Sequence, residues 1–158
     1  ITPINLKELV NQTDAEFEDK MQQAGLKCIV HMAEDEIIIL GDGRRVYRIL
    51  ENLYGNVVKY AMHGTRVYVD LYQKGDMAVF TIKNISAEEL NITAEELTER
   101  FVRGESSRTT EGSGLGLSIA QSLTELMKGN FEIHLDGDLF AANVAFPLKE
   151  TQPDKEDQ

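Results

Sequence analysis

Helical and strand-like patterns alternate along this chain, and their order limits the possible fold more than any single motif does. Apolar residues at helical spacing predict four helices, over 5–24, 44–63, 93–101 and 115–127. Branched or alternating apolar runs predict three pairs of consecutive strands: 26–32 with 37–40, 66–73 with 77–83, and 130–135 with 139–148. No strand–helix–strand crossover period repeats. We therefore expect an α+β fold, a two-layer α/β sandwich whose mostly antiparallel mixed sheet is covered on one face by helices.

The length and the charge of the chain limit its class. With 158 residues it fits one domain with a hydrophobic core, which we expect over 1–149, followed by a disordered acidic tail over 150–158. The net charge of −11 argues against binding nucleic acid through a basic face, but not against binding one nucleotide. The single cysteine, Cys28, excludes an intramolecular disulfide and a cysteine-based zinc site, and it fits a cytoplasmic setting.

A glycine-rich turn precedes the helix predicted over 115–127. Gly112, Gly114 and Gly116 stand at every second position there. A glycine backbone can pass close to a bulky anion, and the first turn of a helix offers unpaired N–H groups and the positive end of its dipole. This combination predicts a phosphate site. A tight loop before an ordinary amphipathic helix would give the same pattern, so the glycines alone leave both interpretations open.

A polar stripe follows one face of the helix predicted over 44–63. It contains Asn52, Asn56 and Lys59, with Tyr60 beside it. Asparagine is a poor helix former, so two of them one turn apart need a reason. Asparagine carbonyls are suitable ligands for Mg²⁺, and a lysine one turn on suits a phosphate. A hydrated surface would explain the stripe equally well.

Three stretches together resemble the ATP-binding domain of sensor histidine kinases. Residues 51–60 (ENLYGNVVKY) are similar to its N box, 101–104 (FVRG) to its F box and 112–120 (GSGLGLSIA) to its G2 box. The order and spacing of the boxes agree over nearly the whole chain. The wider superfamily includes gyrase, Hsp90-type chaperones and MutL-type repair proteins, and the chain has no P-loop motif.

The resemblance implies a site for Mg²⁺ and ATP on the helix over 44–63. Asn56 would coordinate Mg²⁺, with Asn52 as a second candidate ligand on the same face. Lys59 would contact a phosphate and Tyr60 would line the nucleotide site. In the hydrolytic branches of the superfamily Glu51 would act as a base.

The resemblance also implies a lid over the nucleotide. Phe101 would anchor the start of the lid, and Arg103 or Arg108 would reach the γ-phosphate. The base of the lid and the helix after it would wrap the phosphates through five residues: Gly112, Gly114, Leu115, Gly116 and Leu117.

One box departs from the family pattern. After the strand over 77–83 the family has a D-x-G-x-G element (G1), whose aspartate accepts a hydrogen bond from the adenine amino group. Here 84–88 reads NISAE, so Asn84 takes the aspartate position and both glycines are absent. A neutral acceptor in place of a charged one costs on the order of 1 kcal/mol, or fivefold in affinity. We expect weaker binding or altered specificity.

The phosphoacceptor histidine of a kinase is usually followed by Glu or Asp on a helical hairpin, and none of His31, His63 and His134 has that setting. We therefore expect the acceptor on a separate dimerisation domain before residue 1, with residues 1–5 as the linker. The implied protein is a protein-histidine kinase of a two-component system, with a response regulator as indirect partner. We expect the cytoplasmic part of a membrane-anchored sensor, monomeric as a fragment and homodimeric in its parent. Two alternatives stay open: a degenerate docking module with weak or no ATP binding, and a hydrolytic ATPase of the same superfamily.

Overall fold

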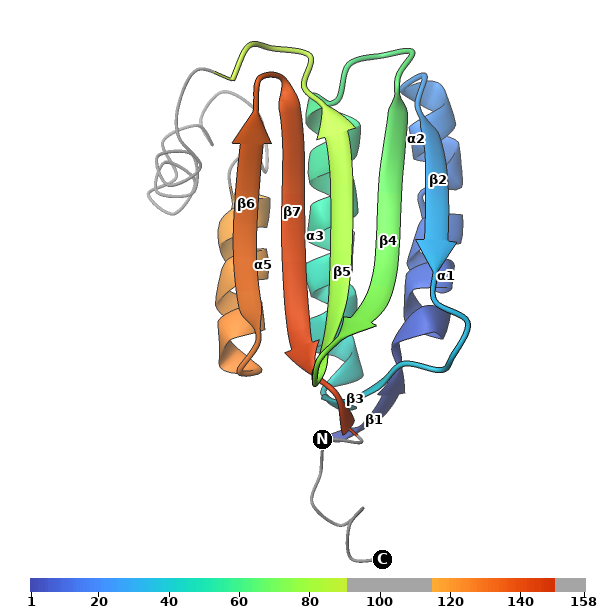
Figure 1. Cartoon of the computed structure of the whole chain (residues 1–158). Helices are drawn as coiled ribbons and strands as arrows, with labels where there is room; N and C mark the ends of the chain where they lie inside the picture. The colour runs from blue at the N-terminus through green and yellow to red at the C-terminus, as the bar shows by residue number, and fades with distance from the viewer. Residues whose placement is uncertain (91–114, 150–158) are drawn as a thin grey trace, which may run out of the picture.

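In the computed structural model, which describes residues 1–90 and 115–149, one layer of strands covers one layer of helices (Figure 1). The helices are α1 (Leu6–Glu16), α2 (Glu18–Gln23), α3 (Gly43–Tyr60) and α5 (Leu115–Leu126). The strands are β1 (Thr2–Asn5), β2 (Lys27–Met32), β3 (Ile38–Gly41), β4 (Arg66–Lys74), β5 (Met77–Ile85), β6 (Asn130–Asp136) and β7 (Leu139–Pro147). The predicted helix over 93–101, most of the predicted lid and the predicted tail lie outside the described residues.

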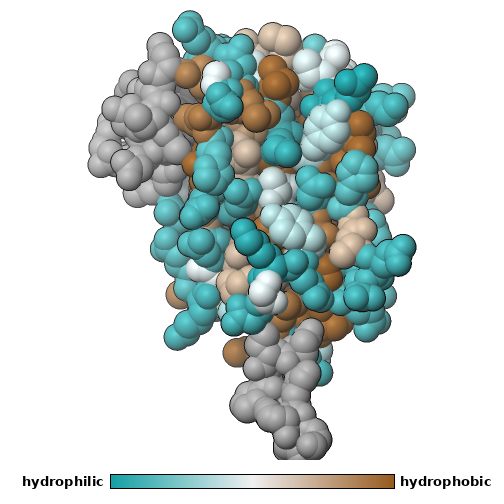
Figure 2. All heavy atoms as spheres, in the orientation of Figure 1, coloured by the Kyte–Doolittle hydropathy of each residue, from teal (hydrophilic) through white to brown (hydrophobic). Residues whose placement is uncertain are grey.

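The main sheet has five strands in the order β2-β4-β5-β7-β6. Its β2–β4 pair is parallel, and the other three pairs are antiparallel. The helices lie behind the sheet in Figure 1, and the opposite face carries mostly hydrophilic side chains (Figure 2). The predicted α+β sandwich with a mostly antiparallel mixed sheet is therefore confirmed.

The first predicted strand pair does not form. Instead β2 lies parallel to β4, and β3 pairs antiparallel with β1 in a separate two-stranded sheet. The prediction of residues 1–5 as a linker did not include this strand. Pairing with β1 satisfies the backbone groups of β3 and brings the buried side chains of Ile4 and Ile39 into register.

The helix predicted over 5–24 is broken at Phe17, where the backbone has φ −97° and ψ 4°. The buried Phe17 ring packs against the Tyr54 ring of α3, with their centroids 5.3 Å apart. After the break α2 restarts and buries Met21. A contact with another helix thus decides where the first one ends.

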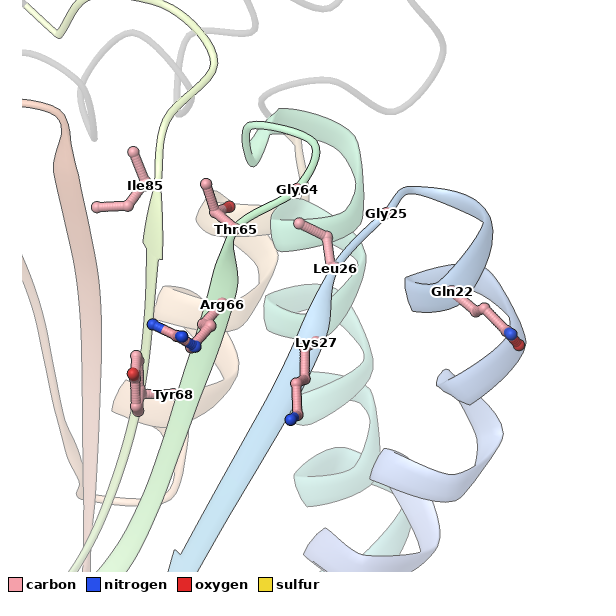
Figure 3. A pocket seen from close by; sticks show the side chains of 9 residues that line it. All are labelled: Gln22, Gly25, Leu26, Lys27, Gly64, Thr65, Arg66, Tyr68 and Ile85. Carbon is pink, nitrogen blue, oxygen red and sulfur yellow. The ribbon is translucent and has the colours of Figure 1, made fainter.

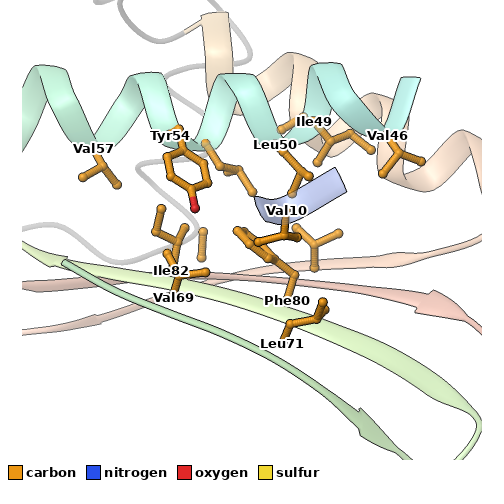
Figure 4. Close-up of a cluster of buried hydrophobic side chains, with 14 of the residues drawn as sticks. Val10, Val46, Ile49, Leu50, Tyr54, Val57, Val69, Leu71, Phe80 and Ile82 are labelled. Carbon is orange, nitrogen blue, oxygen red and sulfur yellow. The ribbon is translucent and has the colours of Figure 1, made fainter. Parts of the chain in front are cut away.

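The core lies between α3 and the central strands (Figure 4). Six residues of α3 are buried, at the spacing expected of one helix face: Val46, Ile49, Leu50, Leu53, Tyr54 and Val57. On β5 the inward positions alternate as Ala78, Phe80, Ile82 and Asn84, all buried. Each large aliphatic side chain of this kind contributes about 1.5–3 kcal/mol on burial. Asn84 therefore ends an otherwise apolar row that faces the helices.

The turn after α5 needs a glycine for close packing. A left-handed residue at the end of a helix is usually glycine, but here Lys128, and not Gly129, has the left-handed backbone (φ 64°). A Cβ atom on Gly129 would lie 2.4 Å from the carbonyl oxygen of Ala145 and 3.0 Å from a methyl group of Thr124. Gly129 is thus needed for space, next to a backbone that cannot move cheaply.

Gly129→Ala is therefore expected to lower the free energy of unfolding by about 2 kcal/mol, because the new methyl group overpacks against β7. Lys128→Gly is the matched change in the same turn, and it is expected to raise stability by up to about 1 kcal/mol by relieving the left-handed lysine. Urea unfolding measures both. An unchanged midpoint for Gly129→Ala would show that the turn is more open in solution.

Candidate functional site

The polar face of α3 meets the start of α5. Asp42 caps α3, and its side chain accepts a hydrogen bond of 2.9 Å from the backbone N–H of Arg44. A Cβ atom on Gly116, in the first turn of α5, would lie 3.6 Å from Oδ1 and 3.7 Å from the backbone oxygen of Asn52. The structure thus brings two sequence-predicted residues, Asn52 and Gly116, into contact range.

The side-chain amide nitrogen of Asn52 is buried and has no hydrogen-bond partner among the described residues. A buried donor without a partner costs about 1–3 kcal/mol. An oxygen-bearing ligand that reaches this nitrogen would remove this cost. Because the nitrogen is a donor, it suits an anionic oxygen.

Asn84 is the second buried amide without a full set of partners. It is 3% exposed, and its Oδ1 has no hydrogen-bond partner among the described residues. The ends of β5 and α3 are tied together, since Met62 N–H donates to the Ile85 carbonyl (2.8 Å) and Ala87 N–H to the Tyr60 carbonyl (2.9 Å). Asn84 therefore presents a lone acceptor on the helix side of the sheet, near the end of α3.

The other predicted residues on α3 differ in exposure. Asn56 and Tyr60 are half-buried, whereas Glu51 and Lys59 are exposed. Leu117 is fully buried, so its side chain belongs to the core. Six predictions are not described by the structure: Phe101, Arg103, Arg108, Gly112, Gly114 and the side chain of Leu115.

A polar cluster beneath α3 was missed by sequence reasoning. The Tyr54 hydroxyl donates to Asp14 Oδ1 (3.0 Å), and the Cys28 thiol donates to the same oxygen (3.2 Å). Burial, together with the negative charge of Asp14, raises the pKa of both the Cys28 thiol and the Tyr54 phenol well above their usual values. Cys28 packs against the core as a thiol, and the cluster ties α1 and β2 to the part of α3 that carries Asn52 and Asn56.

Two further searches concern only residues 1–90 and 115–149. No helix in this part of the chain is long and apolar enough to cross a membrane. The same residues contain no group of three or more His, Cys, Asp or Glu side chains that could hold a metal ion.

The comparisons with known proteins agree with this geometry. The family model described as histidine kinase-, DNA gyrase B-, and HSP90-like ATPase matches residues 41–155. The chain therefore belongs to this ATPase family. Within it, the chain is an ATP-binding catalytic domain of the kind found in the sensor histidine kinases of two-component systems.

Its curated relatives are sensor proteins. The sensor histidine kinase RppB of Synechocystis sp. is 30% identical over 130 residues, which are 81% of this chain and 29% of the relative. The probable sensor protein PcoS of Escherichia coli is 30% identical over 136 residues, 85% of this chain and 28% of the relative. The chain thus spans less than a third of the length of these proteins.

Solved structures share the fold. The catalytic domain of the histidine kinase ThkA has a TM-score of 0.80 at 20% identity, and the match covers 92% of this chain and 94% of that chain. The mycobacterial sensor histidine kinase MprB has a TM-score of 0.74 at 23% identity, with 92% and 97% covered.

Proposed function

We propose that this domain binds Mg-ATP between α3, α5 and the end of β5, and that it transfers the γ-phosphoryl group to a histidine of a separate domain. The observation that carries the proposal is a pair of buried polar atoms, Asn52 Nδ2 and Asn84 Oδ1, that have no hydrogen-bond partner in the described part of the chain. One is a donor suited to a phosphate oxygen and the other an acceptor suited to an amino group. Full-length ShkA, which shares the fold (TM-score 0.76, 22% identity), was solved in complex with AMPPNP.

At the adenine end, Asn84 Oδ1 would accept a hydrogen bond from the amino group of the base. As a neutral acceptor it binds less strongly than the aspartate of the family pattern. Ser86 and Glu88 stand where that pattern has glycines. Ser86 is buried and its hydroxyl oxygen accepts the Glu88 N–H (3.1 Å), so this side chain is engaged in its own turn. The variant G1 segment would thus weaken binding at the adenine end.

At the phosphate end, α3 would provide Asn52 and Asn56, with Lys59 adding positive charge one turn on. The first turn of α5 would add backbone N–H groups. Mg²⁺, when bound to Asn56, would neutralise charge on the phosphates. Gly112, Gly114, Leu115 and either Arg103 or Arg108 would complete the site. The work of the protein is positioning and charge stabilisation rather than covalent chemistry.

The phosphoryl acceptor would come from outside these residues. His31 lies on β2 with its side chain 70% exposed, 3.7 Å from Asp70, and His134 lies on β6, 3.3 Å from Glu132. Neither faces the amides of α3, because both occupy the sheet face opposite the helices. We propose a phosphoacceptor domain preceding this one in a homodimeric, membrane-anchored parent, with this domain in the cytoplasm and a response regulator receiving the phosphoryl group.

Calorimetric titration with ATP, with and without Mg²⁺, tests the proposal. We expect saturable binding that requires Mg²⁺, and transfer of labelled γ-phosphate when the phosphoacceptor domain of the parent is added. No heat at millimolar nucleotide would favour the docking-module alternative. Rapid release of phosphate without an acceptor, abolished by Glu51→Gln, would favour the hydrolytic alternative.

A further inference from the structure

A hollow of about 690 Å³ lies near the ends of β2, β4 and β5, where Lys27, Arg66 and Tyr68 face away from the helix layer, and Gln22 of α2 lines its edge (Figure 3). Its lining includes Leu26, Lys27, Thr65, Arg66, Tyr68 and Ile85. Its volume falls within the range of small-molecule sites, about 300–1,000 Å³. The alternation of β5 places Asn84 on the helix side and Ile85 on the side of this hollow, so it is separate from the proposed nucleotide site.

The hollow is lined by two cations that face the same way. Lys27 and Arg66 are register partners in the parallel pair β2–β4, and Lys83 stands one row further, opposite Tyr68. Among the residues that the structure describes, no carboxylate lines the hollow or lies within ion-pair distance of these cations. Two cations with no carboxylate partner in 1–90 or 115–149, in a chain of net charge −11, favour an anionic ligand.

The rest of the lining suits a flat, apolar group. Tyr68 is 37% exposed, so its ring is accessible, and Ile85 adds aliphatic surface. Arg66 and Tyr68 are two residues apart on one face of β4, and Figure 3 shows the guanidinium directed toward the ring. A planar group held near both can stack on either.

The other end of the same sheet face supplies an internal comparison. Tyr72, 40% exposed, and Lys74 lie on the same strand and line a smaller hollow of about 280 Å³. That hollow has one cation and also a carboxylate, Glu132. Both hollows thus have an exposed tyrosine near a lysine. Of these two hollows, the one at Lys27 and Arg66 has two cations and no carboxylate in its lining.

We propose that the Lys27–Arg66 hollow binds an organic anion that carries an aromatic ring. Arg66 and Lys27 donate hydrogen bonds to the oxygens of its phosphate or carboxylate group. Tyr68 and the apolar wall hold the ring. Because this ligand and the nucleotide occupy opposite faces of the sheet, the two bind at the same time.

The test is a titration of the ¹⁵N-labelled chain, saturated with Mg-ADP, with four probes followed by amide chemical shifts. The probes are 1-naphthyl phosphate, 1-naphthoate, 1-naphthol and inorganic phosphate. We expect both aryl anions to shift amides of residues 25–27 and 64–68. Naphthol lacks the anionic group and inorganic phosphate lacks the ring, so each is expected to bind about tenfold more weakly. The positions of the shifted amides distinguish binding at this hollow from binding at the α3 site, even if the nucleotide itself fails to bind.

Variants on one strand supply matched controls. Arg66→Gln and Tyr68→Ser are expected to weaken aryl-anion binding about tenfold and fivefold, whereas Lys74→Gln and Tyr72→Ser change it by less than about twofold. All four side chains are exposed, so the amide spectrum of each variant verifies its fold. Equal losses in the control variants, equal binding of naphthol, or no shift at these amides with millimolar probe would each overturn the proposal.

Discussion

Replacing Asn56 with alanine is expected to lower the affinity for Mg-ATP by about a hundredfold, the scale of losing a metal ligand, and to leave the fold intact. Asn56 is half-buried on α3, one turn after Asn52, and it is not one of the core residues of this helix. Alanine is also the better helix former, so the free domain should be at least as stable as the wild type. Calorimetry measures the affinity and urea unfolding the stability.

The role of the metal is separated by repeating the titration without Mg²⁺. If Asn56 acts through Mg²⁺, the wild type and the variant should bind metal-free ATP equally weakly. An equal loss with and without the metal would mean that Asn56 contacts the nucleotide directly. Wild-type affinity in the variant would show that the metal assignment is wrong. Asn11→Ala, an exposed asparagine on α1, is the matched control and should change nothing.

Local sequence patterns predicted the two hairpins, whose strands are neighbours in the chain. The two hairpins form where expected, as β4–β5 and β6–β7, because consecutive strands joined by a short glycine-containing turn readily pair with each other. The partner of β2 was not predictable in this way, since the alternation in a strand does not say which distant strand it joins. The break at Phe17 has the same cause, because the Tyr54 ring that receives Phe17 lies on another helix.

The candidate site shows a similar division. Helical spacing placed Asn52 and Asn56 on one face, and the position of Asn84 after a strand indicated its role by resemblance. The sequence gives no information on whether an amide is satisfied. That Asn52 Nδ2 and Asn84 Oδ1 are buried, with no partner within 1–90 and 115–149, follows only from the packing of α3, α5 and β5. The Asp14 cluster was not predictable for another reason. Tyr54 occupies an apolar position of its helix, and its hydroxyl donates to Asp14, which lies on a different helix, α1.

Asn84→Leu is expected to have two effects of opposite sign. It removes a buried carbonyl oxygen without a partner and keeps a side chain of similar size next to Ile82, so the free energy of unfolding should rise by about 1–2 kcal/mol. It also removes the proposed acceptor for the adenine amino group and leaves that group unpaired, so Mg-ATP affinity should fall at least about tenfold. Urea unfolding and calorimetry on the same preparation measure both.

A variant that is more stable and binds less cannot be explained by misfolding. Thr81→Val is the control, because Thr81 is buried on the other side of the same strand and should leave Mg-ATP affinity unchanged. Lower stability in Asn84→Leu would mean that water satisfies the oxygen in the free domain. Unchanged affinity would place the base elsewhere.

Asn84→Asp completes the series by restoring the carboxylate of the family pattern. A charged acceptor should bind the amino group on the order of fivefold more tightly than the amide does. The free domain should be less stable than the wild type, because the carboxylate is buried at a position 3% exposed, with no partner among the described residues for an oxygen placed where Oδ1 now lies. Nucleotide should restore much of that loss, because it supplies the missing donor. If affinity is unchanged or weaker, the adenine does not lie at Asn84. In that case Asn52 Nδ2 and Asn84 Oδ1 do not bind the same ligand.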